Sequence, residues 1–145
     1  MKIALIVLVL LVVLVIGGLF YLGQQSRSGS APGLSNGQLA ACPSSPNCVS
    51  SESSASEDQA VDPLSADSWD RLPAAVQALG GTVTRQDPDY LSAEFVSSLF
   101  KFTDDVEFRR ADDGVHVRSA SRVGHSDMGA NRARVEALRA QLASG

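Results

Sequence analysis

The apolar run at the N-terminus constrains this chain more than any other feature. Residues 3 to 16 include no polar side chain, and the six residues that follow (Gly-Gly-Leu-Phe-Tyr-Leu) extend the run to residue 22. At about 1.5 Å per residue, a helix of this length spans roughly 30 Å, the thickness of the hydrocarbon core of a bilayer. We therefore expect residues 1–22 to form a transmembrane anchor, in contact with the membrane over residues 3–22.

A cleaved signal peptide is the alternative to an anchor. The apolar region of a signal peptide usually contains about 7 to 15 residues and is followed by a small-x-small cleavage site, whereas the residues after Leu22 read Gly-Gln-Gln-Ser-Arg. The sequence favours an uncleaved anchor and leaves cleavage open. Lys2 and the α-amino group precede the run, and only Arg27 follows it closely. The positive-inside rule then predicts a cytoplasmic N-terminus and an extracytoplasmic domain.

The two cysteines agree with that compartment. Cys42 and Cys48 enclose a five-residue loop with two prolines, and the chain has no other cysteine. Such a pair beyond an anchor is typical of a disulfide in an oxidising compartment, with free thiols as the main alternative. Zinc binding is disfavoured because neither histidine is near in sequence. Residues 39–42 (Leu-Ala-Ala-Cys) resemble a lipobox, but a largely polar stretch of about nineteen residues separates this cysteine from the apolar run.

Composition divides the rest of the chain. Residues 23–41 are rich in Gly, Ser, Gln and Asn, which predicts a flexible linker, and residues 42–145 form the extracytoplasmic domain. Within this domain, residues 42–60 hold the cysteine loop and a Ser/acidic stretch too polar to pack, and residues 61–143 hold the folded core. The net charge is −4, so we expect no nucleic-acid partner for this acidic, tethered domain.

Hydrophobic periodicity predicts the order helix, four strands, helix. The first helix is expected over 67–79, although Pro73 suits only the first turn, so that regular helix would start nearer Asp70. Strands are expected at 82–86, 90–96, 102–110 and 115–122, and the second helix from Ser126 or Asp127 to Leu142, with Met128, Val135, Leu138 and Leu142 as its buried stripe. The predicted fold class is α+β, a two-layer domain in which an antiparallel four-stranded sheet carries both helices on one face, preceded by a single transmembrane helix.

The last two strands are expected to pair as a hairpin. A four-residue loop over 111–114 sets Phe108 opposite Val117 on the buried face, and Glu107 opposite Arg118 on the other face. A two-residue Asp-Gly turn would instead place two arginines opposite each other, which like charges disfavour. The second face, which includes His116, is expected to be exposed.

A dense set of polar residues joins the last strand to the last helix. Arg118, Arg122, Arg132 and Arg134 form a candidate anion-binding or partner-binding site, because guanidinium groups and the free N–H groups of a helix start both bind anions. The alternative is architectural, with these arginines paired to the domain's own carboxylates. The residues expected to be structural polar groups are Ser119, Ser121, Asp127, Asn131, Asp105 and Glu107.

No catalytic residue, metal or cofactor is predicted. Asp104, Asp105 and Glu107 resemble a carboxylate cluster, but strand alternation places Asp104 on the opposite face from the other two. The adjacent residues His125-Ser126-Asp127 cannot readily supply the relay geometry of a catalytic triad. Asn131 lies on the apolar stripe of the last helix and is expected to bond a buried backbone group near the helix start.

Three motifs resemble those of the DUF1499 family (domain of unknown function 1499). The first is residues 42–51 (Cys-Pro-Ser-Ser-Pro-Asn-Cys-Val-Ser-Ser), and the second is residues 102–108 (Phe-Thr-Asp-Asp-Val-Glu-Phe). The third is residues 118–124 together with Asp127, Gly129, Asn131 and Arg134. The expected helix that contains Trp69 and Leu72 also resembles the family. The resemblance extends over residues 42–142. It implies a protein of bacterial envelopes, with relatives in chloroplasts, and it brings no assigned activity, substrate or catalytic residue.

The expected function is that of a non-enzymatic binding or accessory domain. Its expected location is the bacterial inner membrane, with the C-terminal domain in the periplasm and an envelope protein or an anionic ligand as partner. Two alternatives remain: an enzyme of unknown reaction that uses a thiol of Cys42 or Cys48, and a purely structural envelope protein.

Overall fold

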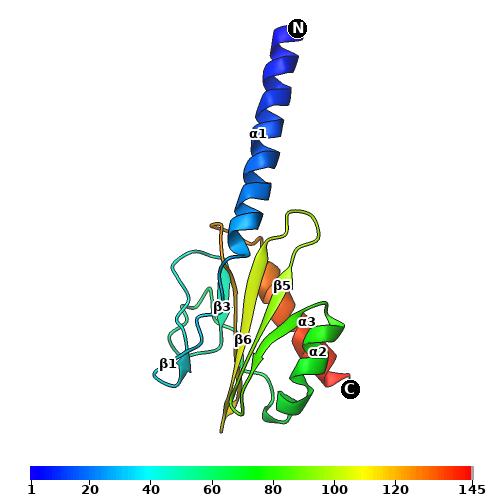
Figure 1. Ribbon diagram of the computed structural model, residues 1–145. Coiled ribbons are helices and arrows are strands. Elements are labelled where there is room, and N and C mark those ends of the chain that lie inside the picture. Colours follow the sequence, from blue (N-terminus) through cyan, green and yellow to red (C-terminus); the bar gives the residue numbers. More distant parts are fainter. Residues whose placement is uncertain (145) are drawn as a thin grey trace.

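One long helix leads into an α+β domain built on an antiparallel sheet, in a computed structural model that describes residues 1–144 (Figure 1). The elements, in chain order, are α1 (Lys2–Ser26), β1 (Leu34–Ser35), β2 (Gln38–Leu39), β3 (Cys48–Ser50), the 3-10 helix η1 (Ala66–Arg71), α2 (Leu72–Ala78), β4 (Thr82–Gln86), β5 (Tyr90–Val96), β6 (Thr103–Ala111), β7 (Gly114–Ser121) and α3 (Ala130–Ala143). The α+β class and the element order from α2 to α3 agree with the prediction.

The sheet has five strands rather than the predicted four. Its strand order is β3-β7-β6-β5-β4, and every neighbouring pair is antiparallel. The additional strand β3 pairs with β7, with Cys48 opposite Ala120 and Ser50 opposite Arg118. This strand is only three residues long and lies in a stretch of polar composition. Periodicity over so short a segment gives no signal, and the strand forms because β7 provides a partner edge.

The predicted register of the β6–β7 hairpin is confirmed. Phe108 lies opposite Val117, and Glu107 lies opposite Arg118. The ladder continues for one pair beyond the expected strand ends, so the turn itself consists of residues 112 and 113.

The two predicted helices begin later than expected. Residues 66–71 form a 3-10 helix, and the α-helix starts at Leu72 because Pro73 has no N–H to donate and fits only the first turn. α3 starts at Ala130, and Met128 before it is 98% exposed, so this residue is not part of the buried stripe. Asp127 acts at the helix start as predicted, because its carboxylate accepts the N–H of Asn131 at 2.8 Å.

One face of the sheet packs against η1, α2 and α3 and forms the hydrophobic core (Figure 1). Its largest fully buried apolar side chains are Phe108, Leu72, Leu91, Leu138, Val76, Val106, Val115, Val117 and Val135. Trp69, the one tryptophan of the chain, is buried at the edge of this core and reports on its integrity by fluorescence.

The opposite face of the sheet is covered by the segment that composition marks as a flexible linker. The N–H of Gly33 donates to Glu107 Oε1 at 2.8 Å, and the N–H of Leu39 donates to Glu52 Oε1 at 3.0 Å. Leu39 is only 3% exposed. The structure differs from the expected free tether because buried carboxylates on the sheet side accept backbone N–H groups of this segment. His116, expected at the surface, is also buried, with Ser51 and Glu52 at one ring nitrogen and Asp113 at the other.

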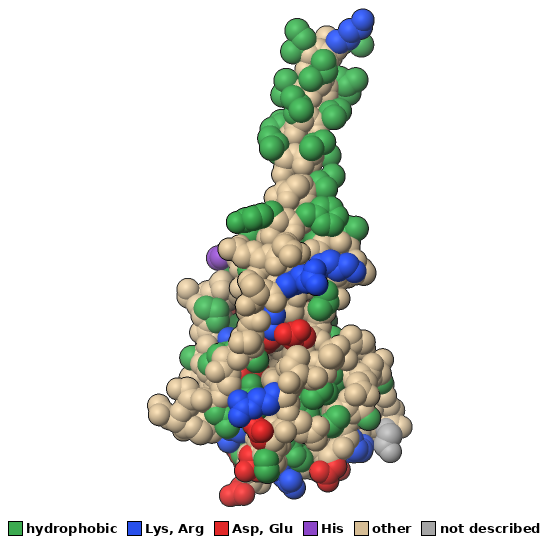
Figure 2. Space-filling model, in the orientation of Figure 1, with side chains coloured by type: hydrophobic (Ala, Val, Ile, Leu, Met, Phe, Trp, Pro, Cys, Tyr) green, Lys and Arg blue, Asp and Glu red, His purple; other side chains and the backbone are tan. Residues whose placement is uncertain are grey.

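Helix α1 is long and apolar enough to cross a membrane, with a mean hydropathy of 3.4 over its most apolar window. Its apolar side chains stand free of the domain along most of its length (Figure 2). The last turn differs, because Gly23 and Ser26 are buried against the β5–β6 loop. The helix therefore ends in contacts with the domain.

Candidate functional site

The disulfide loop and the β7–α3 junction meet in space although they are far apart in sequence. Cys42 and Cys48 form a disulfide, which closes the loop that contains Asn47. Asn47 Nδ2 donates to the Gly124 carbonyl at 2.7 Å, and the Asn47 carbonyl accepts the N–H of Ser121 at 2.9 Å. The loop is thereby fixed to the end of β7, where the candidate arginine site was expected.

Asn131 is the centre of the hydrogen bonds at this junction. Its side chain is fully buried in the first turn of α3. The amide nitrogen donates to the Asn47 carbonyl at 3.0 Å, which agrees with the expected bond to a buried backbone group. The other partners of this amide are Ser121 Oγ and Asp127 Oδ2 for the nitrogen, and Ser119 Oγ and Arg134 for the oxygen. A neutral amide suits this position because it donates and accepts at once.

The carboxylate of Asp127 is held charged beside this amide. Burial raises its pKa, but the N–H groups of Asn131 and Gly129 donate to the carboxylate and keep the pKa below its ordinary value. Asp127 therefore acts as an acceptor for the helix start and not as a proton donor.

Arg134 is fully used within the domain. Its guanidinium group donates to Asp104 Oδ2 at 2.7 Å and to Ser119 Oγ at 3.1 Å, and it lies over the ring of Phe95, 4.8 Å from the ring centroid. These contacts hold the guanidinium plane in one orientation and pair its positive charge with Asp104. They leave little of Arg134 for an external anion.

Arg122 joins the sheet to the end of α1, on the face opposite the helices. It makes a bidentate pair with Asp105, at 2.8 and 2.7 Å, and a further ion pair with Glu94. Its remaining terminal nitrogen donates to the Ser26 carbonyl, the last of α1, at 3.1 Å. The hydrogen bonds to Asp105 raise the pKa of Arg122 further above its ordinary range.

Two more arginine–carboxylate pairs lie on the same face, under the covering segment. Arg118 donates to Glu107 Oε2 at 3.0 Å, and the hydroxyl of Tyr90 donates to Glu107 Oε1 at 2.8 Å. Burial raises the pKa of Tyr90, and its bond to Glu107 raises it further. Arg109 makes a bidentate pair with Glu52, at 2.8 and 3.0 Å. We call the three pairs, centred on Arg122, Arg118 and Arg109, the buried charge layer.

Sequence alone does not single out Glu52 and Arg109 of the buried charge layer, or Tyr90 and Glu94, which bond to its members. Glu52 lies in the Ser/acidic stretch that was expected to stay unpacked, and Tyr90 and Arg109 lie on predicted strands. Alternation along β6 places Arg109 on the same face as Glu107. That pattern, three charged residues in succession on one face of a strand, is the signal that identifies Arg109 as a member of the layer.

We expect the Glu52–Arg109 pair to make the domain sensitive to acid. Burial raises the pKa of Glu52, but the hydrogen bonds and charge of Arg109 outweigh it and hold the pKa below its ordinary value. A lowered pKa stabilises the fold above the unfolded-state pKa, and this stabilisation disappears as the pH falls through the folded-state pKa. Glu52→Gln should cost about 2 kcal/mol at about pH 7 and much less at about pH 3.

Urea unfolding of the full chain in detergent, followed by Trp69 fluorescence, measures this difference. Glu57→Gln is the matched control, since Glu57 is an exposed neighbour, and it should leave stability unchanged at both pH values. An equal loss for Glu52→Gln at both pH values would contradict the assignment.

Arg132 is the one exposed residue among the four candidate arginines. It donates to the carbonyl oxygens of Ala60 and Asp58, at 2.9 and 2.7 Å, and so fixes the acidic loop to α3. All four candidate arginines therefore have partners inside the domain, which favours the architectural alternative over an anion site at this junction.

The carboxylates of β6 lie on opposite faces, as strand alternation predicts. Asp104 faces α3, whereas Asp105 and Glu107 belong to the buried charge layer. Within residues 1–144 no group of three or more His, Cys, Asp or Glu side chains is arranged to hold a metal ion.

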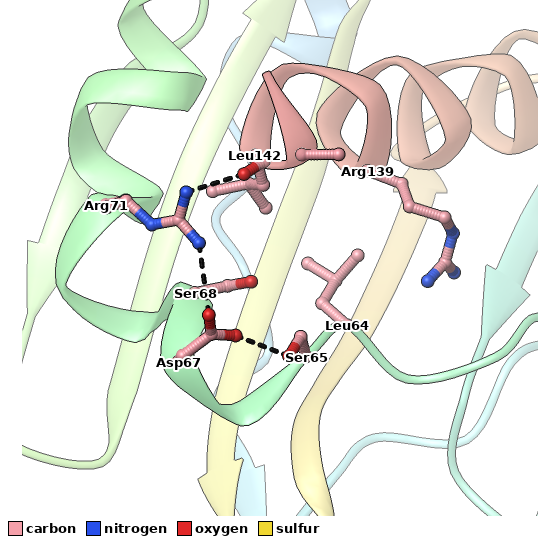
Figure 3. A pocket seen from close by; sticks show the side chains of 8 residues that line it. Leu64, Ser65, Asp67, Ser68, Arg71, Arg139 and Leu142 are labelled. Atoms are coloured by element: carbon pink, nitrogen blue, oxygen red, sulfur yellow. Dashed lines mark hydrogen bonds and ion pairs between the residues drawn. The ribbon is translucent and has the colours of Figure 1, made fainter. Parts of the chain in front are cut away.

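An open groove of about 420 Å³ lies between η1 and the end of α3 (Figure 3). Arg71 crosses it, donating to the Leu142 carbonyl at 2.6 Å and pairing with Asp67 at 3.5 Å. Asp67 also accepts from Ser65, and this bond holds the pKa of Asp67 below its ordinary value. Arg71 thus joins the end of α3 to η1, and Arg139, which also lines the groove, donates to the carbonyl oxygens of Pro63 and Asp62.

A family model described as "Protein of unknown function (DUF1499)" matches residues 38–142. No curated protein and no solved structure matches the chain. The matched range contains the disulfide loop, the whole five-stranded sheet and most of α3. The networks around Asn131 and in the buried charge layer therefore lie almost entirely within it.

Proposed function

We propose, on the premise that this chain belongs to the DUF1499 family, that it is a single-pass protein of the bacterial inner membrane. In this proposal α1 spans the membrane with its N-terminus in the cytoplasm. The domain lies in the periplasm, held against the membrane surface, and it binds a partner without catalysing a reaction. The partner is an envelope protein or an anionic ligand.

The attachment of α1 to the domain carries this proposal. Ser26 Oγ accepts the N–H of Thr103 at 3.0 Å, and the Ser26 carbonyl accepts from Arg122. Gly23 lies so close to the β5–β6 loop that a Cβ atom there would be 1.7 Å from the Phe100 carbonyl oxygen. A helix that ends in such contacts gives the domain one orientation relative to the membrane. A fixed orientation suits a module that presents one surface to a partner.

The state of the polar side chains supports a binding role over an enzymatic one. A thiol-dependent enzyme needs a thiolate, and both cysteines are joined in the disulfide, with Cys48 buried in β3. The buried carboxylates accept hydrogen bonds from arginines, so that neither partner of each pair is poised to move a proton. The purely structural alternative predicts a domain that binds nothing.

Reporter fusions test the topology on the full chain in a bacterial host. Alkaline phosphatase fused after residue 145 should be active, because it folds only in the periplasm, and green fluorescent protein at the same position should stay dark. A variant that lacks residues 3–22 should reverse both results. A fluorescent full-length fusion with inactive phosphatase would overturn the proposed orientation.

Trypsin tests the fixed attachment, because Arg27 follows α1 directly. Gly23→Leu should detach the helix end and speed cleavage at Arg27 about tenfold or more, since local opening governs proteolysis. Gly18→Leu is the matched control, because a Cβ atom at Gly18 has nothing within 4 Å. Equal cleavage of wild type and Gly23→Leu would argue against the attachment.

Native mass spectrometry of gently extracted protein separates the binding role from the structural one, since only a binding module retains a partner.

A further inference from the structure

The β5–β6 loop, residues 97–102, places apolar side chains at the level where α1 leaves the membrane. Phe100 packs edge-on against Phe20 of α1, with ring centroids 5.2 Å apart. Phe20 belongs to the last turn of the apolar run, so the loop reaches the boundary of the hydrocarbon core. Leu99, at the tip of the loop, is 65% exposed. An exposed leucine at this depth contacts lipid rather than water.

A groove of about 400 Å³ opens beside this loop. Its lining residues are Arg27, Glu94, Val96, Lys101 and Thr103. Arg27 lies five residues beyond Leu22, about 7.5 Å further along the helix axis, which is the outer edge of a headgroup region roughly 5 to 7.5 Å thick. The groove therefore lies at headgroup depth. Figure 2 shows Lys and Arg side chains gathered directly beneath the apolar helix on the face in view.

The two cations of the groove differ from the arginines of the buried charge layer. Among the residues described, neither Arg27 nor Lys101 has a carboxylate oxygen within 4.0 Å. Glu94, the acidic residue of the lining, is paired with Arg122. The groove therefore presents two exposed positive charges without acidic partners.

The backbone at Lys101 adds a second indication. Its φ of +61° is in the left-handed region, which is uncommon for a residue other than glycine. Such conformations cluster at ligand sites, where the surrounding structure holds them. Here the turn places the Lys101 side chain at the groove while Phe100 packs on α1.

We propose that this groove binds the headgroup of an anionic phospholipid from the outer surface of the membrane that α1 crosses. The phosphate oxygens accept from Arg27 and Lys101, and the acyl chains pass Val96 and Leu99 alongside α1. The assignment rests on the proposed function, since α1 must span the membrane to set this depth. Inorganic phosphate shares the charge of the headgroup but has no apolar part to contact Val96 and Leu99.

Titration of the full chain in a non-ionic detergent tests the proposal. Short-chain phosphatidylglycerol should bind saturably, about tenfold or more tighter than short-chain phosphatidylcholine, and inorganic phosphate should show no binding in the same range. Arg27→Gln with Lys101→Gln should weaken phosphatidylglycerol binding about 25-fold, since each surface cation contributes about fivefold. Arg85→Gln with Arg110→Gln removes the same charge from exposed positions at the far ends of β4 and β6, away from the groove, and should have no effect.

Three results would overturn the assignment to a lipid. These are phosphatidylglycerol binding that survives the Arg27/Lys101 double substitution, equal binding of the two lipids, and inorganic phosphate that binds as tightly as phosphatidylglycerol. Carbonate extraction of membranes distinguishes a wrong lipid assignment from a wrong proposal about the membrane anchor. Protein that leaves the membrane refutes the anchor, whereas protein that stays without preferring phosphatidylglycerol refutes only the lipid site.

A tryptophan at the loop tip reports depth independently. In liposomes that contain lipids brominated near the glycerol, Leu99→Trp should add fluorescence that the bromine quenches. Wild type provides the control, because Trp69 is buried and lies beside Arg110, near the other end of β6. An added signal that bromine leaves unquenched would show that the loop stands clear of the bilayer.

Discussion

Replacing Arg122 with methionine is expected to destabilise the domain by about 4 kcal/mol. The substitution keeps the length and apolar surface of the side chain but removes the bidentate partner of Asp105, whose side chain is 5% exposed. A buried carboxylate without its partner is strongly unfavourable, and this loss dominates the effect. The Ser26 carbonyl at the end of α1 also loses a donor.

Urea unfolding of the full chain in detergent, followed by Trp69 fluorescence, measures this loss. Arg85→Met is the matched control, because Arg85 is an exposed arginine of the same sheet and does not contact the reporter Trp69, and it should change stability by less than about 1 kcal/mol. Adding Asp105→Asn to Arg122→Met should restore part of the stability, since it removes the unpaired charge. A stably folded Arg122→Met protein would return Arg122 to the role of a binding residue.

Sequence predicts best those strands in which every second side chain packs into the hydrophobic core. β4 and β5 have the predicted bounds, and the register of β6 with β7 follows from matching Phe108 with Val117 and Glu107 with Arg118. The three residues of β3 carry no periodicity of their own and gain their stability from pairing with β7, a partner about seventy residues away in sequence.

The buried charge layer lies on the face of the sheet that strand alternation predicts to be exposed. A strand that alternates apolar with charged residues ordinarily exposes the charged face to water. On β6 and β7 the charges of the two strands are complementary, so that Glu107 and Arg118 can be buried together. What buries them is a segment of Gly, Ser and Asn whose own composition predicts no packing. The contacts of Gly33 with Glu107 and of Leu39 with Glu52 show how this segment packs.

The four candidate arginines are close to one another in sequence, but in the structure they bond to groups of the domain itself rather than forming an open anion site. Local sequence places Arg118, Arg122 and Arg134 near a strand end and a helix start. It does not reveal that Glu107, Asp105 and Asp104 lie opposite them at 3 Å or less. The partners come from another strand, so their distance depends on the register of the whole sheet. Within residues 1–144, Arg27 and Lys101 have no such acidic partner, and the proposed site for a ligand therefore includes these two residues.

Asn131→Ala is expected to destabilise the domain by about 3 kcal/mol. The substitution removes the donor to the Asn47 carbonyl and the acceptor for Ser119 and Arg134, all in a site that excludes water. Buried polar groups that lose a partner account for most of the effect, and a cavity the size of the amide adds to it. The adjacent variant Arg132→Ala, at an exposed position of the same helix, should cost less than about 1 kcal/mol.

The disulfide gives this prediction a local readout. Because Asn131 holds the loop through the Asn47 carbonyl, its loss should let the loop open and expose the Cys42–Cys48 bond to reductant. We expect dithiothreitol to reduce the disulfide of Asn131→Ala about tenfold faster than that of the wild type under native conditions, as local opening becomes easier. Mass spectrometry after alkylation measures the rate. A variant that is less stable globally but unchanged in reduction rate would show that Asn131 supports the helix start alone and does not hold the disulfide loop.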